Sequence, residues 1–322
     1  MKKNIILSLF ALFCTTFVSA QNDNDKYARK VLLEEFTTEK CPNCPNGARQ
    51  IAELLFDKDY TDNVIVVAHH AGYYFDWLTT DADESLVWFY NSYQTYAPAM
   101  MFDRYPFFTD YYSNGAGSPT PVYFMSSTAD LKKYVDKRMD VEANVGFEIS
   151  GMFDNEETLN VEVKGDRKKV FCDTDARITV YITEDRIPAK SQAGGSKGYK
   201  HSHVMRACSS TWGDVIKWDG DSFTFDCKFK IDPSWNKDEL SIVAFVSAFD
   251  DADPTKCVVE NTRSIPFSIT NGIQDMNADG TEVAETAYYT LDGVRTEVKS
   301  HGMYIQKKTY TDGTVKTRKV AL

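Results

Sequence analysis

The sequence has no excess of positive charge and, after its first twenty residues, no long apolar run. It contains 36 Lys and Arg residues against 47 Asp and Glu residues, which gives a formal net charge of −11 at pH 7. Because an acidic surface repels the phosphate backbone, we expect no nucleic-acid partner. A transmembrane helix needs about 20 consecutive apolar residues, so we also expect no transmembrane span in the mature chain.

Cysteine is scarce as well, with seven residues in a chain of 322. Cys41 and Cys44 form a close pair, and no second pair has the spacing typical of a structural zinc site. His69 and His70 would have to supply the remaining ligands, so we do not expect zinc at this position. The sequence indicates no cofactor.

The first twenty residues have the pattern of a secretory signal. Two lysines precede an apolar run, and Val18-Ser19-Ala20 provides the small residues of a cleavage site. Cys14 follows Phe13, which is too large for a lipidation site, so we expect cleavage after Ala20. We therefore predict an exported protein, located in the periplasm, in the outer membrane or on the cell surface.

A reactive thiol pair is predicted directly after the first apolar strand. The run Val31–Phe36 is followed by Cys41-Pro42-Asn43-Cys44 and then by a helical pattern. The N-terminus of a helix favours a thiolate through its unpaired N–H groups and its partial positive charge. We expect Cys41 to be the exposed, attacking sulfur and Cys44 to be the resolving thiol.

The remainder of residues 21–140 alternates between strand and helix. Apolar residues recur at helical spacing after Cys44, around Leu86 and around Tyr134. Between these helices we expect a buried strand over Asn63–Ala68 and a short strand entered through Pro98. The pattern predicts an α/β unit that ends near residue 140.

After residue 140 the pattern changes to short β-branched runs separated by turn residues, which predicts an all-β antiparallel sandwich over 141–270. The glycine-rich stretch Ser191–Lys200 is predicted to be a flexible loop. A polar linker, 271–284, leads to a small C-terminal β module, 285–322, with a hairpin about Asp312-Gly313. The seven predicted strands are Asn144–Ile149, Thr158–Val163, Arg177–Thr183, His203–Cys208, Ser222–Ile231, Leu240–Phe249 and Cys257–Ile269.

Residues 29–140 resemble the thioredoxin fold, because a strand, a Cys-x-x-Cys, a helix and a later proline occur in that order. The segments Glu34–Thr37, Cys41–Gly47 and His201–Arg206 are similar to the twenty-eight-kilodalton outer-membrane-protein family of Bacteroidetes. That resemblance implies a thioredoxin-like domain before an immunoglobulin-like β-sandwich, in surface proteins described as adhesins or receptors. The tail from Tyr288 resembles modules that sort proteins to the cell surface.

The resemblance implies two further site residues. Glu35 lies where thioredoxins keep a buried acid, whose raised pKa would let it shuttle the proton of Cys44. Because neighbouring residues of a strand face opposite sides, Glu34 is the alternative for the buried position. Pro98 lies where the thioredoxin fold keeps a cis-proline that helps hold an incoming peptide, although a trans bond is possible from sequence alone.

His201 and His203 point to one face of a strand and are weak candidates for a metal site. The favoured interpretation is a structural corner packed with Arg206 and Trp212. A second uncertain group is the aromatic segment Tyr73–Trp77 with Tyr105–Tyr112, which is either a peptide- or glycan-contacting surface or ordinary core.

Four cysteines lie in the β-rich region, and an even number in an exported chain favours disulfides. We expect them to be structural, with Cys208 bridged to Cys227 and Cys172 to Cys257 as one of several open pairings. Cys41–Cys44 could likewise be a permanent structural disulfide.

Three functions are consistent with these patterns. The first is an exported thiol–disulfide oxidoreductase, whose partners would be the thiols and disulfides of proteins or peptides. The second is a cell-surface adhesin or receptor, in which the thioredoxin-like domain is a non-catalytic scaffold and the β-sandwich binds a surface ligand. The third is a structural component of the envelope.

Overall fold

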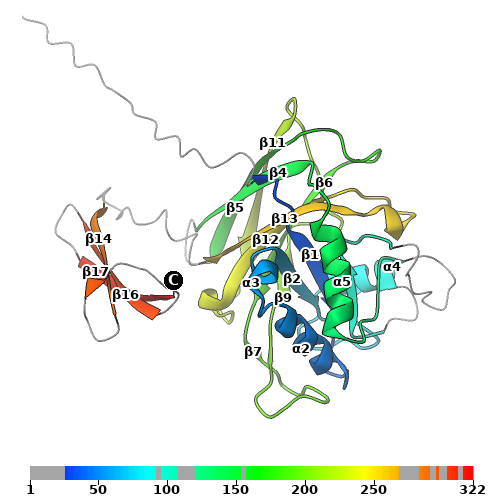
Figure 1. Ribbon diagram of the computed structural model, residues 1–322, viewed down its shortest axis with the longest axis horizontal. Helices are drawn as coiled ribbons and strands as arrows, with labels where there is room; N and C mark the ends of the chain where they lie inside the picture. Colours follow the sequence, from blue (N-terminus) through cyan, green and yellow to red (C-terminus); the bar gives the residue numbers. More distant parts are fainter. Residues whose placement is uncertain are drawn as a thin grey trace, which may run out of the picture.

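The computed structural model describes residues 26–91, 96–107, 120–153, 157–267, 283–290, 295–296, 303–310 and 315–321 (Figure 1). The predicted signal, most of the predicted linker and the turn at Asp312-Gly313 lie outside these residues. Within the described ranges, no helix is long and apolar enough to cross a membrane.

A mixed sheet of eight strands forms the centre of the molecule. Its strands follow the order β13-β12-β6-β9-β2-β1-β3, and β10 pairs with β6. Strand β1 runs parallel to β2 and antiparallel to β3. The strands are β1 (Val31–Phe36), β2 (Val64–His69), β3 (Ala99–Phe102), β6 (Arg177–Glu184), β9 (Val204–Cys208), β10 (Asp214–Val215), β12 (Leu240–Ser247) and β13 (Val259–Pro266).

Four helices accompany the first three strands. The last of them begins after Ser127, whose side chain accepts a hydrogen bond from the Asp130 amide, as expected for an N-cap. The helices are α2 (Cys44–Leu54), α3 (Lys58–Thr61), α4 (Asp81–Asn91) and α5 (Thr128–Met139). The α/β pattern predicted for this part of the chain is therefore present.

Both faces of β1 are buried because different helices cover them. Leu33 packs in a core with residues of α2 and α5, whereas Phe36 packs with residues of α4. Successive side chains of a strand point to opposite faces, so Glu35 faces the side of α2 and Glu34 faces the side of α4. This alternation places the two carboxyl groups in different surroundings.

The β-rich region is joined to the preceding α/β part through the same sheet. β2 pairs with β9 in parallel through Ala68 and Val204, so the sheet continues across the predicted boundary near residue 140. A second, antiparallel sheet of three strands shares a hydrophobic core with β6 and β12. Its strands are β4 (Val145–Phe153), β5 (Thr158–Arg167) and β11 (Ser222–Lys230). All seven predicted β runs contain strands, while the immunoglobulin-like topology stays a prediction.

The described C-terminal residues form a separate four-stranded antiparallel sheet in the order β15-β14-β16-β17. β16 and β17 are paired around the position of the predicted hairpin. The remaining elements are β7 (Ile187–Pro188), β8 (Lys200–His201), β14 (Val283–Tyr289), β15 (Arg295–Thr296), β16 (Met303–Tyr310), β17 (Val315–Ala321) and the 3-10 turns η1 (Lys237–Glu239) and η2 (Pro254–Lys256).

Candidate functional site

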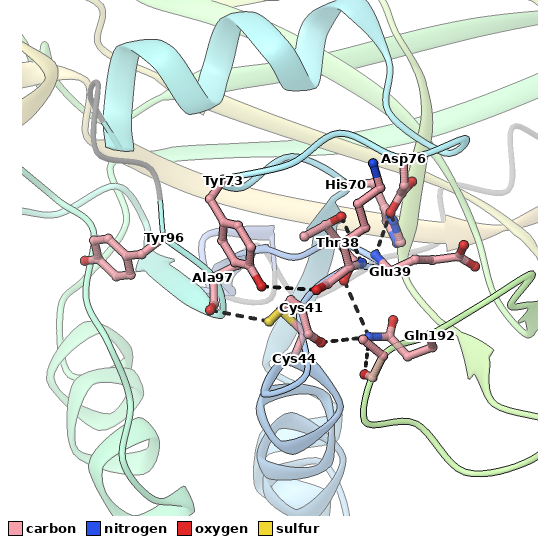
Figure 2. Close-up of a disulfide and its surroundings, with 12 residues drawn as sticks. Thr38, Glu39, Cys41, Cys44, His70, Tyr73, Asp76, Tyr96, Ala97 and Gln192 are labelled. Atoms are coloured by element: carbon pink, nitrogen blue, oxygen red, sulfur yellow. Dashed lines mark hydrogen bonds and ion pairs between the residues drawn. A yellow bond between two sulfur atoms is a disulfide. The ribbon is translucent and has the colours of Figure 1, made fainter.

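Cys41 and Cys44 form a disulfide at the beginning of α2, with their Cα atoms 5.4 Å apart. Both cysteines are only 1% exposed. The expectation that Cys41 is exposed is therefore wrong for this closed, oxidised state. Cys41 Sγ lies 3.4 Å from the carbonyl oxygen of Ala97, and Tyr73 donates a hydrogen bond of 3.2 Å to the carbonyl of Lys40 (Figure 2).

The loop between β7 and β8, residues 189–199, which we call the 189–199 loop, contacts the main chain of the Cys41 segment. Its Gln192 side chain donates a hydrogen bond of 2.9 Å to the carbonyl oxygen of Cys41 (Figure 2). The two residues are 151 positions apart in the chain. The local motif around Cys41 gave no sign of a contact from such a distance.

Glu35 lies beside the first turn of α2, as expected. A Cβ added to Gly47 would lie 2.7 Å from Glu35 Oε1 and 2.8 Å from Pro98 Cβ, so glycine is needed where these side chains approach the helix. Glu35 Oε1 is buried without a hydrogen-bond partner among the described residues. Burial raises the pKa of Glu35 to about 8.

Pro98 also lies where the sequence predicted it, directly before β3. The Ala97–Pro98 peptide bond is cis. The β1–β3 pairing places Ala99 opposite Phe36 and Met100 opposite Glu35. Residues far apart in the chain, Glu35, Cys44 and Pro98, are thereby gathered around the first turn of α2.

Glu34 is buried too, so the expectation that only one of the two neighbouring acids is buried is wrong. Its carboxylate accepts hydrogen bonds of 2.7 and 2.8 Å from Arg104 and lies 3.1 Å from His69 Nε2. Burial alone would raise the pKa of Glu34, but Arg104 and His69 lower it to about 2. Helices on both faces of β1 are the reason that both acids are buried.

Arg104 was not identified from the sequence. Besides Glu34, its guanidinium group donates to the hydroxyl groups of Tyr90 and Tyr181, each at 3.1 Å. His69 completes the network through Asp83, at 2.9 Å from its Nδ1. Since these side chains come from β1, β2, α4 and β6, the network holds the α/β part and the β-rich part together.

A second polar cluster, also missed from the sequence, lies next to the disulfide. Glu39 Oε1 lies 3.2 Å from His201 Nε2, and the His201 and His70 rings meet edge to face at 4.7 Å. His70 Nδ1 lies 2.9 Å from Asp76. Burial is opposed by hydrogen bonds from Trp77, His201 and the backbone, which together lower the pKa of Glu39.

His201 and His203 are directed to different carboxylates. His201 contacts Glu39, as described above, whereas His203 Nδ1 lies 3.3 Å from Asp185. The described part of the chain contains no group of three or more His, Cys, Asp or Glu residues able to hold a metal ion. The weak candidacy of this pair for a metal site is therefore not supported.

The structural corner predicted for the two histidines is wrong as well. Arg206 pairs with Glu184 and lies over Trp235. Trp212 instead packs against Phe89 and Phe249.

The four remaining cysteines of the predicted mature chain are free thiols in the described structure, which contradicts the predicted structural disulfides. Cys208 packs on the face of the large sheet that carries Tyr181, whereas Cys227 lies in the core between the two sheets. The sheet thus separates the two expected partners. The free cysteines are Cys172, Cys208, Cys227 and Cys257.

The aromatic segment beside the disulfide lies at the surface. Tyr73, Tyr74 and Trp77 are 39%, 55% and 40% exposed. Tyr74 contacts the ammonium group of Lys40, and Trp77 contacts that of Lys190 at 3.9 Å from the ring centre. The second predicted segment differs, because Phe107 is buried in the core and residues 108–112 lie outside the described part.

Comparisons with known proteins agree with this fold. Residues 120–264, less than half of the chain, match the model of the family described as outer membrane protein Omp28. This confirms the resemblance to the twenty-eight-kilodalton outer-membrane-protein family, although the matched region does not include Cys41 and Cys44. A comparison with curated proteins gave no match.

The chain also resembles solved structures. The structure described as HBP35 of Porphyromonas gingivalis has a TM-score of 0.64 and 18% identity, and the match covers 92% of this chain and 99% of that one. This likeness shows a shared fold. The structure described as a domain of the outer membrane lipoprotein Omp28 from the same organism has a TM-score of 0.28 and 19% identity, and the match covers 38% of this chain and 87% of that one.

Proposed function

We propose that this chain, which carries an Omp28-family region, is an exported thiol–disulfide oxidoreductase of the cell envelope. Its thioredoxin-like part would perform the exchange through Cys41 and Cys44, and its β-rich part, which we propose to be an immunoglobulin-like sandwich, would cover and position that site. The family's name supports a location at the outer membrane. The observation that carries the proposal is the buried Oε1 of Glu35, which has no hydrogen-bond partner among the described residues and lies beside the helix that begins at Cys44.

A permanent structural disulfide gives no reason for that carboxyl group. Its raised pKa of about 8 is close to the ordinary thiol pKa of about 8.5. Groups of similar pKa exchange a proton readily. An unpaired buried acid is otherwise destabilising, so its presence beside the dithiol supports a function in proton transfer.

The reduced dithiol would act in two steps. The Cys41 thiolate attacks a substrate disulfide, forms a mixed disulfide and releases one substrate thiolate. Cys44 then gives its proton to the Glu35 carboxylate and attacks the Cys41 sulfur, which releases the second substrate thiolate. The substrate disulfide gains two electrons, and Cys41 and Cys44 return to the disulfide seen in the structure. Pro98 and Ala97 would help hold the peptide next to Cys41.

The test is the reduction of insulin disulfides with dithiothreitol as the electron source. We expect the wild-type protein to accelerate the reaction and Cys41→Ser to lose that acceleration. Cys172→Ser is the matched control, because it removes a free, half-buried thiol far along the chain and leaves the Cys41–Cys44 pair intact. We expect it to retain wild-type activity.

Cys44→Ser supplies a second readout. It leaves the attacking sulfur but removes the resolving one, so a mixed disulfide with insulin should accumulate on a non-reducing gel. Equal activity of wild type and Cys41→Ser would contradict the proposal and favour a scaffold that binds surface ligands.

A further inference from the structure

The 189–199 loop projects from a short two-stranded ribbon. In this ribbon, β7 and β8 pair Ile187 with His201 and Pro188 with Lys200. A hydrogen bond of 3.0 Å from the Ala189 amide to the Tyr199 carbonyl continues the pairing into the loop. The loop is therefore held at its base as a hairpin, and its tip reaches the main chain of Cys41 and Pro42.

The tip contacts the Cys41 segment through its main chain and through one amide side chain. The Ala193 amide donates a hydrogen bond of 2.7 Å to the carbonyl of Glu39. The Gln192 side chain donates to the carbonyls of Cys41, at 2.9 Å, and Thr38, at 3.5 Å. Figure 2 shows Gln192 on the side of the disulfide opposite to Tyr73 and Ala97. Main-chain carbonyls beside a reactive cysteine are groups that an extended peptide could also engage.

The approach is closest at Gly194, which has a φ of +69°. A Cβ added there would clash with the Pro42 carbonyl oxygen and lie 3.0 Å from its carbonyl carbon. Gly198, with a φ of +79°, has the same kind of backbone conformation, but a Cβ added there meets nothing within 4 Å. Of these two glycines, only Gly194 approaches the Cys41 segment.

Glu39 fixes the base of the loop to the same segment. Its carboxylate accepts a hydrogen bond of 2.7 Å from the Lys190 amide and lies 3.2 Å from His201. Tyr199 lies near Glu35, since burial and the Glu35 charge raise the pKa of Tyr199 to about 12. The base of the loop is therefore bonded to the Cys41 segment through the Glu39 carboxylate.

We propose that the 189–199 loop is a lid that takes the place of the substrate's main chain at the dithiol. An extended polypeptide reaches Cys41 only after the lid has left, and it then donates its own amide hydrogens to the carbonyls of Glu39 and Cys41. Opposite Pro42 the lid itself presents a glycine, so the substrate class is an unfolded or loosely folded chain with a small residue at that position. This inference rests on the proposed function.

A reagent can reach the disulfide only in those molecules whose lid is open. The rate of any reaction between the disulfide and a reagent is therefore proportional to the fraction of open molecules. Variants that weaken the lid should therefore speed up a single reduction of the disulfide, which does not require the protein to act as a catalyst. The reaction we choose is the reduction of Cys41–Cys44 by dithiothreitol, followed by quenching and counting of alkylated cysteines by mass spectrometry.

Gly194→Ala and Gly198→Ala are matched variants, because both place a side chain at a positive φ and only the first meets Pro42. We expect Gly194→Ala to raise the second-order rate constant of reduction at least about tenfold, which is the effect of losing one or two hydrogen bonds. Gly198→Ala should stay within about twofold of the wild type. Gln192→Ala changes no backbone and should also accelerate reduction, and circular dichroism checks that each variant is folded.

Rates of Gly194→Ala and Gln192→Ala equal to that of the wild type would overturn the lid. Faster reduction in these variants, without any insulin reductase activity in the wild type, would keep the lid and reject the enzyme. Insulin reduction that depends on Cys41, with no effect of the lid variants on the rate of disulfide reduction, would keep the enzyme and reject the lid.

Discussion

The pH dependence of stability offers a direct test of the surroundings of Glu35. We consider Glu35→Gln, which replaces the carboxyl group with a neutral amide of nearly the same shape. The amide brings its own unpaired polar atoms into the site, but that cost does not change with pH. The difference in unfolding free energy between wild type and variant therefore isolates the ionisation of Glu35.

The sign and size follow from the pKa, which rises from an ordinary 4.5 to about 8 in the folded protein. Below pH 4.5 the acid is neutral in both states, so its ionisation costs nothing. Between pH 4.5 and 8 the unfolded chain releases the proton while the folded chain keeps it, and the folded state loses stability as the pH rises. A shift of 3.5 pH units corresponds to about 5 kcal/mol, complete above pH 8.

The measurement is urea denaturation of the oxidised wild type and Glu35→Gln at several pH values from 4.5 to 9. We expect the wild type to lose stability relative to the variant across this range. Cys41 and Cys44 must stay oxidised during the experiment, because a free Cys44 thiol would lose its proton in the same pH range as Glu35. A difference between the two proteins that does not change with pH would refute the proposed surroundings of Glu35.

Three further results are expected. Glu34→Ala should lower the free energy of unfolding, measured in urea, by about 3–5 kcal/mol, because it leaves the charge of Arg104 buried without a partner. A loss below about 1 kcal/mol would contradict the burial of the Glu34–Arg104 pair. Burial and the nearby His70 lower the pKa of His201, so the stability of the wild type relative to His201→Gln should fall as the pH drops below about 6.5 in thermal unfolding; a difference that does not change with pH would count against it. The oxidised mature protein, unfolded in guanidinium, should react with Ellman's reagent at four thiols. These are Cys172, Cys208, Cys227 and Cys257. Two reactive thiols, or none, would support the structural disulfides predicted from the sequence.

Elements with strong local patterns could be predicted from the sequence. The apolar run of β1, the amphipathic spacing of α2 and the Ser127 cap of α5 each depend on residues close together in the chain. The prediction of one site from Cys41, Cys44 and Pro98 depends on their order along the chain, which resembles that of a known fold. The raised pKa of Glu35 then followed from its place on β1.

The wrong predictions all depend on contacts between distant segments. Gln192, which bonds the carbonyl oxygen of Cys41, lies 151 residues away from it, and Arg104, which pairs with Glu34, lies 70 residues after it. The expected bridge from Cys208 to Cys227 fails because the two strands belong to different sheets and the large sheet lies between the two thiols. No periodicity within a window of ten or twenty residues carries such information.

The two neighbouring acids of β1 show how one strand can serve stability and chemistry together. Glu34 is ionised because Arg104 pairs with it, and this pair ties β1 to Tyr181 of the β-rich region. Glu35, one residue later and on the other face, has no such partner, so burial raises its pKa to about 8 and it can both hold and release a proton near neutral pH. Environments that separate the pKa values of adjacent acids are typical of sites that use acid–base chemistry. Because the Glu34–Arg104 pair fixes the position of β1, it also holds Glu35 against the first turn of α2, where the proton of Cys44 would be received.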